Sequence, residues 1–573
     1  MKYSYSMKST YNKIKSLIQD QQHSVLSAAS LIMVMIVASR ILGLVRQRVL
    51  AHYFVAEELS LFFAAFRLPD TIFEVLVFGT FASAFIPVFT KTLKDHKEDG
   101  HKKAWEVAGL VANWGGVFFL ILATIVITFA HPLYRIITPG FSSVDQEHIV
   151  LLARILFAAQ GFFVISYVLT AVLESSKRFF VPALAPLFYN LGIIISTILF
   201  YEKLGLMAPV LGVVVGAASH FLIQLPLAMK LGFRFSKSLK ITPEVKKIAK
   251  LSLPRIIEVS FLQVAKFVEL TLASLISVPS YTYFTFGNTI QLLPVGLFGT
   301  SIAKAALPTL ARQADDLPAF KKTLFETLNQ VIFLMAPIVA FLMVARVPVV
   351  RLIFGTDIFT WDATVETSLV VSAFAFGIFS QSINSILARS FYALSDTKTP
   401  VKISIATLLL NIIADYVLVV IYKLPVWSLA AAFSFSCIVQ SIALFVLITN
   451  KIHDGAKKSL YIPVLKMFFS ALVAGSTMYF ILKFFDKSVW IKKLSFLSNL
   501  DLPFEKFVLD TRYAGNLLIL TIIFGVIGIL VYVLILKILK STELDTFINL
   551  FRKMLVGQKF TNMSSEAGQS DVN

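Results

Sequence analysis

Charged side chains interrupt one of the most apolar stretches of this 573-residue chain. The stretch runs from Ala38 to Gly79 and carries Arg40, Arg46, Arg48, Arg67 and Glu74. A charge at the centre of a bilayer costs at least about 2.5 kcal/mol, so such residues normally face other protein groups or a water-filled cavity. Arginine stays charged when it is desolvated and binds phosphate through a fork of N–H donors. The stretch therefore predicts one wall of a cavity that holds an anion inside a membrane.

A second charged stripe is expected on a helix over 248–276. Its members are Arg255, Glu258, Lys266 and Glu269. At 3.6 residues per turn they fall within about 80° of arc, and Gln263 lies just off the stripe. Spacings of three allow two interpretations, which are local ion pairs that neutralise each other inside a packed bundle, or a polar wall that faces the first one.

Together the two stripes predict a substrate site. Its expected side chains are Arg40, Arg46, Arg67, Glu74, Arg255 and Lys266. Arg48 is expected near the outer mouth of the cavity. Guanidinium and ammonium groups in this number suit a large, multiply charged phosphate head group, and they do not suit a small hydrophobic cation.

A third set of polar residues is acidic. Asn411 and Asp415 stand four apart in an expected helix over 401–421, so they share one face. With Glu269 they could supply oxygen ligands for Na⁺ or a carboxylate that binds H⁺. The alternative is a buried aspartate that is hydrogen-bonded to neighbouring Ser or Thr side chains.

The composition is that of a polytopic membrane protein. The chain is 57% apolar and 15% charged, with a mean hydropathy of +0.80. Its single cysteine, Cys437, excludes a disulfide framework and a Cys-based metal site. The net charge of +19 lies mostly in short loops between apolar runs, so we expect contact with membrane lipids and none with nucleic acid. The absence of Walker A and HExxH motifs argues against an enzyme and against a bound cofactor.

The predicted fold is all-α, with fourteen transmembrane helices of roughly 20 or more residues each. Proline interrupts two of the longer ones, at Pro69 and Pro294. The expected spans are 25–48, 59–90, 104–131, 148–174, 181–201, 206–229, 248–276, 281–311, 322–346, 363–388, 401–421, 426–449, 460–484 and 514–540.

The orientation follows from Lys and Arg residues, which gather in alternate loops and at both ends of the chain. This pattern predicts that both termini are cytoplasmic. The expected regions are a cytoplasmic arm 1–24, a first lobe 25–230, a cytoplasmic linker 231–247, a second lobe 248–450, a final helix pair 451–541 with an outer loop 485–513, and a cytoplasmic tail 542–573.

An internal duplication supports the two six-helix lobes. SRILGLV at 39–45 matches PRIIEVS at 254–260, which places Arg40 on Arg255. LVFGTFASAFIPVF at 76–89 matches GLFGTSIAKAALPTL at 296–310, and Pro182 and Asn190 pair with Pro400 and Asn411. The matched positions are all about 215 to 221 residues apart. Repeats of this kind build transporters whose sites lie at the repeat interface, so the lobes are expected to be pseudo-symmetric.

Several motifs resemble the MurJ (MviN) family, lipid II flippases of the multidrug/oligosaccharidyl-lipid/polysaccharide exporter superfamily. They are SRILGLVR, AFRLPD, FGTFASAFIPVF, RFFVPALAPLFYN, LPRIIE, LPVGLFGTSIAKAALPTL and SFYALSDTKTPV. The resemblance implies a V-shaped bundle with a central cationic cavity, and a final helix pair that forms a groove for an undecaprenyl tail. By position, Arg40 and Arg46 match the family's two arginines of the first helix, and Arg67 matches its basic residue before LP.

The chain departs from the family pattern at three places. Ser60 stands where the family usually has an acid, and Phe73 stands where it often has an arginine, with Glu74 following. Around Asn288 and Thr289 the chain lacks the arginine that the family often has in the eighth helix. The sequence leaves open which cation replaces it, and the candidates are Arg255, Lys266 and Lys304.

The predicted function is a lipid II flippase of the bacterial cytoplasmic membrane. It would move an undecaprenyl-pyrophosphate-linked peptidoglycan precursor from the inner to the outer leaflet by alternating access, as a monomer, with Na⁺ or H⁺ coupling possible. One alternative is a flippase for another undecaprenyl-linked glycan, of the O-antigen or teichoic type. Others are a cation-coupled multidrug exporter, which should have an acid-dominated cavity, and a membrane scaffold without transport.

Overall fold

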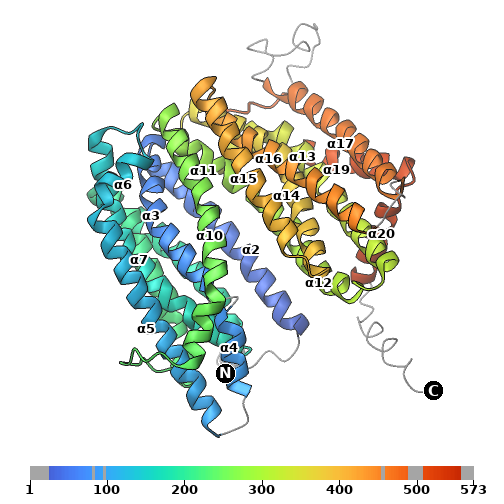
Figure 1. Ribbon diagram of the computed structural model, residues 1–573. Helices are drawn as coiled ribbons and strands as arrows, with labels where there is room; N and C mark the ends of the chain where they lie inside the picture. The colour runs from blue at the N-terminus through green and yellow to red at the C-terminus, as the bar shows by residue number, and fades with distance from the viewer. Residues whose placement is uncertain (1–24, 81–83, 95–97, 453–457, 488–507, 556–573) are drawn as a thin grey trace, which may run out of the picture. The chain divides into compact units, whose positions relative to one another are not determined.

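The computed structural model describes residues 25–80, 84–94, 98–452, 458–487 and 508–555 (Figure 1). In these ranges every regular element is a helix, and a single β-bridge joins Asp486 to Leu509. Apolar runs become helices in a membrane because a helix satisfies all of its backbone hydrogen bonds internally. The predicted all-α class is therefore confirmed.

The chain forms two compact units. The first contains Met1–Leu293, Val350–Phe374 and Ser404–Ser436. Its complete helices are α2 (Val25–Tyr53), α3 (Ala56–Thr80), α4 (Ile86–Lys94), α5 (Glu98–Thr128), α6 (Ala130–Ile137), α7 (Ser143–Ser175), α8 (Phe180–Leu204), α9 (Met207–Leu231) and α10 (Pro243–Ile276), followed by most of α11 (Ser280–Pro294).

The second unit contains Pro294–Val349, Ala375–Ile403 and Cys437–Asn573. The helices from α11 onward are η2 (Val295–Gly299), α12 (Thr300–Arg312), α13 (Leu317–Phe354), α14 (Trp361–Ala393), α15 (Lys398–Tyr416), η3 (Val417–Ile421), α16 (Trp427–Lys451), α17 (Lys458–Phe485), α19 (Ala514–Ile538) and α20 (Thr542–Leu555). Of these, α13, α14, α15 and α16 each contribute residues to both units, and η3 lies wholly in the first unit.

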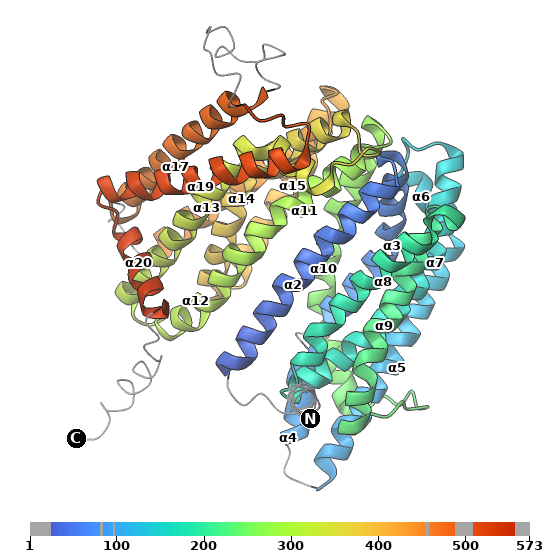
Figure 2. The ribbon, with the colours of Figure 1, turned by 180° about the vertical axis from the view of Figure 1, so that it is seen from behind.

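The last helices pack on α13 within the second unit. Figure 2 shows α17 and α19 side by side, and they contact each other along their length. Buried Met467 of α17 and Phe524 of α19 belong to one apolar cluster with Phe333 of α13. The Tyr532 hydroxyl donates to the Phe333 carbonyl at 2.9 Å, so the buried phenol is satisfied.

In the first unit, small residues set the spacing of α8 and α9. A Cβ added at Gly192 would lie 2.6 Å from the Cα atom of Gly216, so these two backbones touch without side chains between them. Close approach at Gly and Ala is the usual way to pack helices in a bilayer, where no hydrophobic force draws them together. The pair also packs against neighbours in the first unit, α8 against α2 and α9 against α7.

Twelve helical segments in the described ranges are long and apolar enough to cross a membrane. They correspond to the predicted spans from 104–131 onward. Neither α2 nor α3 is among the twelve, and these two helices carry the charged residues of the stretch from Ala38 to Gly79. Part of the predicted span 59–90 falls on residues 81–83, which lie outside the described residues.

Proline acts as expected at one of the two predicted interruptions. Pro294 ends the α-helical pattern of α11, and the five residues of η2 that follow form a π-helix. Proline has no N–H to continue the i→i−4 ladder, so the chain adopts a wider turn there. Pro69 instead lies within α3, which continues to Thr80.

The turns that follow α7 and α14 have the same backbone geometry. After α7 the chain turns through Lys177 at φ 58°, and after α14 it turns through Ser395 at φ 58°. The following N–H groups bond in the same way, from Arg178 to the Leu173 carbonyl at 2.9 Å and from Asp396 to the Phe391 carbonyl at 2.9 Å. A left-handed residue that closes a helix end is a recognised C-terminal motif.

The compact units do not follow the predicted lobe boundary. The sequence places α10 and α11 in the second lobe, whereas α10 and most of α11 group with the first unit. The two pseudo-symmetric lobes remain a prediction.

Candidate functional site

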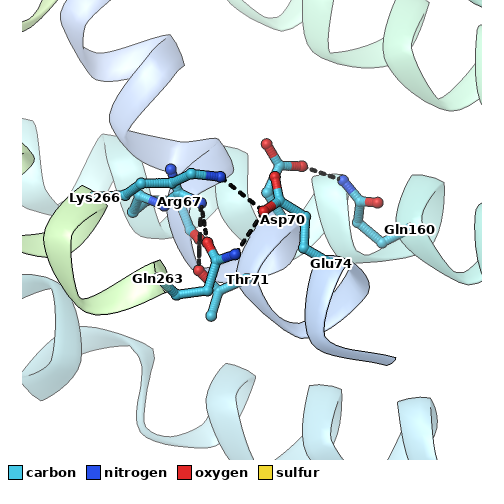
Figure 3. Close-up of polar contacts among 7 residues, drawn as sticks. All are labelled: Arg67, Asp70, Thr71, Glu74, Gln160, Gln263 and Lys266. Atoms are coloured by element: carbon cyan, nitrogen blue, oxygen red, sulfur yellow. Dashed lines mark hydrogen bonds and ion pairs between the residues drawn. The ribbon is translucent and has the colours of Figure 1, made fainter. Parts of the chain in front are cut away.

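The helices α3 and α10 run side by side in the first unit, and α7 packs against α3 (Figure 1). Polar residues on α3 follow one another at spacings of three, one and three, which places them on one face of that helix. They are Arg67, Asp70, Thr71 and Glu74. Gln263 and Lys266 of α10 and Gln160 of α7 face them (Figure 3).

A continuous chain of polar contacts joins α3 to α10. The Arg67 Nη2 atom donates to Gln263 Oε1 at 3.0 Å, and Gln263 Nε2 donates to Glu74 Oε2 at 2.6 Å. Lys266 Nζ donates to the same Glu74 oxygen at 2.7 Å, as an ion pair. Figure 3 shows these bonds converging on Glu74. Two cations predicted to bind substrate are therefore already held by groups of the protein.

Arg67 is the most deeply placed of these cations, with 8% of its surface exposed. Its guanidinium carbon lies 5.8 Å from the centre of the Phe267 ring, at a distance typical of a cation–π contact. Its Nε atom has no hydrogen-bond partner in the described part of the chain. Thr71 donates to the Arg67 carbonyl at 2.7 Å and so turns its hydroxyl toward the same turn of α3.

A third helix holds the other carboxylate of α3. Gln160 Nε2 of α7 donates to Asp70 Oδ1 at 2.6 Å, and Gln160 itself is 2% exposed. The sequence interpretation missed both residues. Asp70 could have been found, because it lies between Arg67 and Glu74 at helical spacing. Gln160 gives no such signal, since a lone glutamine in an apolar helix does not reveal which helix it will face.

The acidic set that was predicted to bind a cation also lies together. Asn411 Nδ2 donates to Asp415 Oδ2 at 2.9 Å, and these residues are 5% and 1% exposed. The second oxygen of Asp415 and the oxygen of Asn411 have no partner among the described residues. Asp415 interacts electrostatically with Glu269 of α10, which in turn interacts with Arg67 and Lys266.

Other predicted cations have different partners. Arg40 Nη1 of α2 lies 3.4 Å from the Leu292 carbonyl, and the Arg46 guanidinium lies 5.9 Å from the centre of the Tyr189 ring. Arg255 is exposed on α10, and the side chain of its predicted partner Glu258 lies outside the described residues. Lys266 forms its ion pair across to Glu74 of α3, which agrees with a stripe that faces the first charged stretch rather than with a local pair within α10.

Arg48 has a structural partner. Its Nη1 atom donates to the carbonyls of Leu352 at 2.7 Å and Ile353 at 3.0 Å, in the last turn of α13. Those carbonyls have no partner within their own helix, and a cation at a helix C-terminus also meets the negative end of its dipole. Arg48 therefore acts as a cap in this structure.

Neutral hydrogen bonds stand at two of the positions where the chain departs from the family pattern. The Ser60 hydroxyl lies 2.8 Å from the Thr282 hydroxyl and joins α3 to α11. Gln47 Nε2 donates to the Thr289 hydroxyl at 3.0 Å and joins α2 to α11. The Ser60 hydroxyl thus stands at the position of the family's acid. The Thr289 hydroxyl stands near the position of the family's arginine.

Comparison with known proteins identifies the family. Residues 50–498 match the family model described as lipid II flippase MurJ, which is more than half of the chain. The chain belongs to the lipid II flippase MurJ family. A probable lipid II flippase MurJ of Borreliella burgdorferi is 25% identical over 474 residues, covering 81% of this chain and 91% of that protein.

Solved structures share the MurJ-family fold. A lipid II flippase MurJ in an inward closed conformation matches with a TM-score of 0.71 at 24% identity, over 89% of this chain and 98% of that one. An inward-facing multidrug resistance MATE transporter of the MOP superfamily matches with a TM-score of 0.61 at 14% identity, over 72% and 94%. These likenesses concern the fold. The match to a flippase family indicates a membrane transporter rather than an enzyme.

The local charge balance includes Asp70, a carboxylate that the sequence interpretation did not place in the site, beside Glu74, which was predicted there, and Glu269 of the predicted stripe. Arg67 and Lys266 meet three carboxylates, those of Asp70, Glu74 and Glu269, as hydrogen-bonded or electrostatic neighbours. No group of three or more His, Cys, Asp or Glu side chains in the described ranges is arranged to hold a metal ion. An anion that approached the same donor of Lys266 would compete with Glu74 for it.

Proposed function

We propose that this protein is a lipid II flippase of the bacterial cytoplasmic membrane. It moves the undecaprenyl-pyrophosphate-linked peptidoglycan precursor from the inner to the outer leaflet by alternating access. The match of residues 50–498 to the MurJ family carries this proposal. Arg67 and Lys266, two cations set on helices of an apolar bundle, agree with an anionic substrate, because such charges are retained in a membrane mainly for function.

The substrate diphosphate binds Arg67 and Lys266 in this proposal. Arg67 supplies a planar fork of donors, and Lys266 supplies a mobile ammonium on a flexible stem. Arg40, Arg46 and Arg255 complete a cationic cavity around the head group, and Glu74 takes part in the same site. The positions of Arg67 and Lys266 beside each other on α3 and α10 support this assignment.

The remaining architecture follows the sequence prediction. The helices α2 and α3 add two spans to the twelve apolar ones, giving fourteen in two pseudo-symmetric lobes. Both termini are cytoplasmic, and the protein acts as a monomer. The groove for the undecaprenyl tail is formed by α17 and α19, whose outward faces carry exposed Leu472 and Ile522.

A coupled ion binds at Glu269, Asn411 and Asp415, and it is Na⁺ or H⁺. Two observations support this part of the proposal. The free oxygens of Asn411 and Asp415 are buried and unsatisfied, which is costly unless a ligand or proton meets them. Glu269 also links the acidic set electrostatically to Arg67 and Lys266, so ion occupancy and substrate binding can affect each other.

The experiment is a flipping assay with purified protein in proteoliposomes and fluorescent lipid II. We expect Arg67→Ala and Lys266→Ala to reduce the rate at least about tenfold, as loss of a charge-assisted contact of about 1.4 kcal/mol would do. Lys237→Ala, an exposed loop substitution, is the matched control and should flip like the wild type. Flipping that is unchanged in both cavity variants would remove the proposed site.

One alternative is a flippase for another undecaprenyl-linked glycan. The observation in its favour is Glu74, a carboxylate in the site and directly after Phe73, where the family often has an arginine. Complementation separates the two candidates, because only a lipid II flippase restores growth to a bacterium depleted of its own.

A second alternative is a cation-coupled exporter. The three carboxylates near Arg67 and Lys266 favour it. The test uses a cationic dye. If the dye competes with neither lipid II nor undecaprenyl diphosphate, and if proteoliposomes do not extrude it, the exporter alternative is excluded.

A further inference from the structure

Glu74 occupies the position that an anionic ligand would need. Its Oε2 atom accepts from both Lys266 and Gln263, and Gln263 in turn accepts from Arg67. One carboxylate oxygen thus satisfies, directly or through one amide, both cations that are proposed to hold the diphosphate. A phosphate oxygen is the same kind of acceptor and would make the same contacts.

We propose that Glu74 is a displaceable counter-anion, whose place on Lys266 and Gln263 the substrate diphosphate takes when it binds. The inference rests on the proposed function and adds a role that sets substrate affinity and release. In the substrate-free protein Glu74 bridges α3 and α10. In the substrate-bound protein that bridge is open.

Access distinguishes Glu74 from the groups around it. The side chains of Lys266 and Glu74 are 38% and 24% exposed, so a ligand can reach their contact from outside the protein. Arg67 is only 8% exposed, and Gln263 only 3%. The ion pair is therefore the open end of the polar chain and the place where exchange of one anion for another can begin.

Asp70 has a different partner in the same site. Gln160 of α7 donates to it at 2.6 Å, and it does not share the contact with Lys266. Glu74 has no donor from α7 in the described contacts, and both of its donors come from α10. Among the described contacts, withdrawal of Glu74 would therefore break bonds with α10 alone and leave the Gln160–Asp70 bond between α7 and α3 in place.

A counter-anion also explains why the site tolerates an acid. Cations in an apolar bundle need a partner while no substrate is present, because an unpaired buried charge is strongly destabilising. Glu74 supplies that partner. Once displaced, its negative charge stays close to the bound diphosphate and repels it, so binding is limited and release is eased.

The first test measures affinity for undecaprenyl diphosphate with the full-length protein in nanodiscs of neutral lipid. We expect Glu74→Gln to bind about tenfold more tightly than the wild type, since it keeps an amide in place but removes the competing charge. Its flipping should be slower, because release is slower. Glu74→Asp keeps the charge and should stay within about threefold of the wild type, and Glu106→Gln on the exposed surface of α5 is the matched control.

The second test needs no substitution. A water-soluble carbodiimide joins a carboxylate to an amine only when the two are in contact, so it should link Glu74 to Lys266 in the wild type. We expect undecaprenyl diphosphate to abolish this crosslink, detected by mass spectrometry. The pair Lys451–Asp396, also 2.7 Å apart, is the internal control and should crosslink equally with and without the ligand.

The outcomes separate this inference from the proposed function. If the wild type binds undecaprenyl diphosphate in a Lys266-dependent way, but Glu74→Gln is not tighter or the crosslink persists at saturation, the counter-anion is refuted and the flippase proposal stands. If the wild type does not bind undecaprenyl diphosphate, both fall. Tighter binding by Glu74→Gln together with loss of the crosslink supports both.

Discussion

Replacing Arg67 by alanine should destabilise the first unit by about 3–5 kcal/mol, the cost of removing one partner from a buried charge cluster. The guanidinium is 8% exposed and donates to Gln263 at 3.0 Å. It is also an electrostatic neighbour of Asp70, Glu74 and Glu269. Without it, Lys266 is left as the cation among three carboxylates, which would repel one another.

The magnitude has two parts. A hydrogen bond from a charged donor contributes about 1.5–3 kcal/mol, and the remainder is the cost of carboxylates left without a counter-charge. Thermal unfolding in detergent measures the effect, and the expected fall in Tm is at least about 6 °C. Arg67→Lys keeps the charge but loses the planar fork of donors, so its Tm should fall less than that of Arg67→Ala. Arg234→Ala, an arginine in the loop after α9, is the control for loss of an arginine as such.

A second substitution checks the reasoning. If unbalanced carboxylates cause the loss, Arg67→Ala combined with Asp70→Asn should regain part of the stability, because one repelling charge is gone. A Tm for Arg67→Ala within about 1 °C of the wild type would refute the buried cluster. A double variant that is less stable than Arg67→Ala would show that Asp70 stabilises by other contacts.

Three further predictions concern other places in the molecule. Gly140→Ala should destabilise the protein by about 3 kcal/mol or more, because the new Cβ would meet the Ser274 carbonyl oxygen and one of the two backbones must shift. Thermal unfolding measures the effect, and an unchanged Tm would contradict that close approach. Asp396→Asn should lower the Tm at pH 7, where Lys451 and then the Thr399 N–H lower the pKa of Asp396 to about 2. The depressed pKa adds stability above about pH 3.9, and this stability is lost as the pH falls through about 2. The difference in Tm between variant and wild type should therefore vanish near pH 2. A difference in Tm that does not change with pH would refute the charge effect. Asp415→Asn should remove the dependence of lipid II flipping on Na⁺ or H⁺, measured in proteoliposomes with opposed gradients, and an unchanged dependence would place the ion elsewhere.

Much of the fold could be predicted because hydropathy and helix period are properties of the local sequence. The spans from 104–131 onward needed only the rule that about 20 apolar residues cross a bilayer. The break at Pro294 followed from the missing N–H of proline. The charged stripe of α10 also followed from periodicity.

Partners across helices could not be predicted in the same way. The spacing of three left open whether Lys266 pairs within α10 or faces the first charged stretch, and the structure pairs it with Glu74 of α3. Periodicity states which face of a helix is polar, but not which helix covers that face. Gln160 was missed for this reason, since its role depends on α7 packing against α3.

The grouping of helices into compact units could not be predicted from the sequence either. Sequence repeats placed α10 in the second half of the chain, and contacts place it in the unit of α3 and α7. A repeat records descent from a common ancestor, whereas a compact unit records which surfaces bury each other. The two need not coincide when polar contacts such as Gln263–Arg67 hold helices of different repeats together.

The turns at Lys177 and Ser395 have the same backbone geometry, although their side chains differ in size and charge. Each closes with a 2.9 Å bond between backbone groups. A left-handed position at the end of a long helix is therefore compatible with either side chain. A glycine at either position would relieve the strain of the left-handed backbone. Substitution by glycine at these two sites is therefore a way to stabilise the protein without changing the charged residues of its interior.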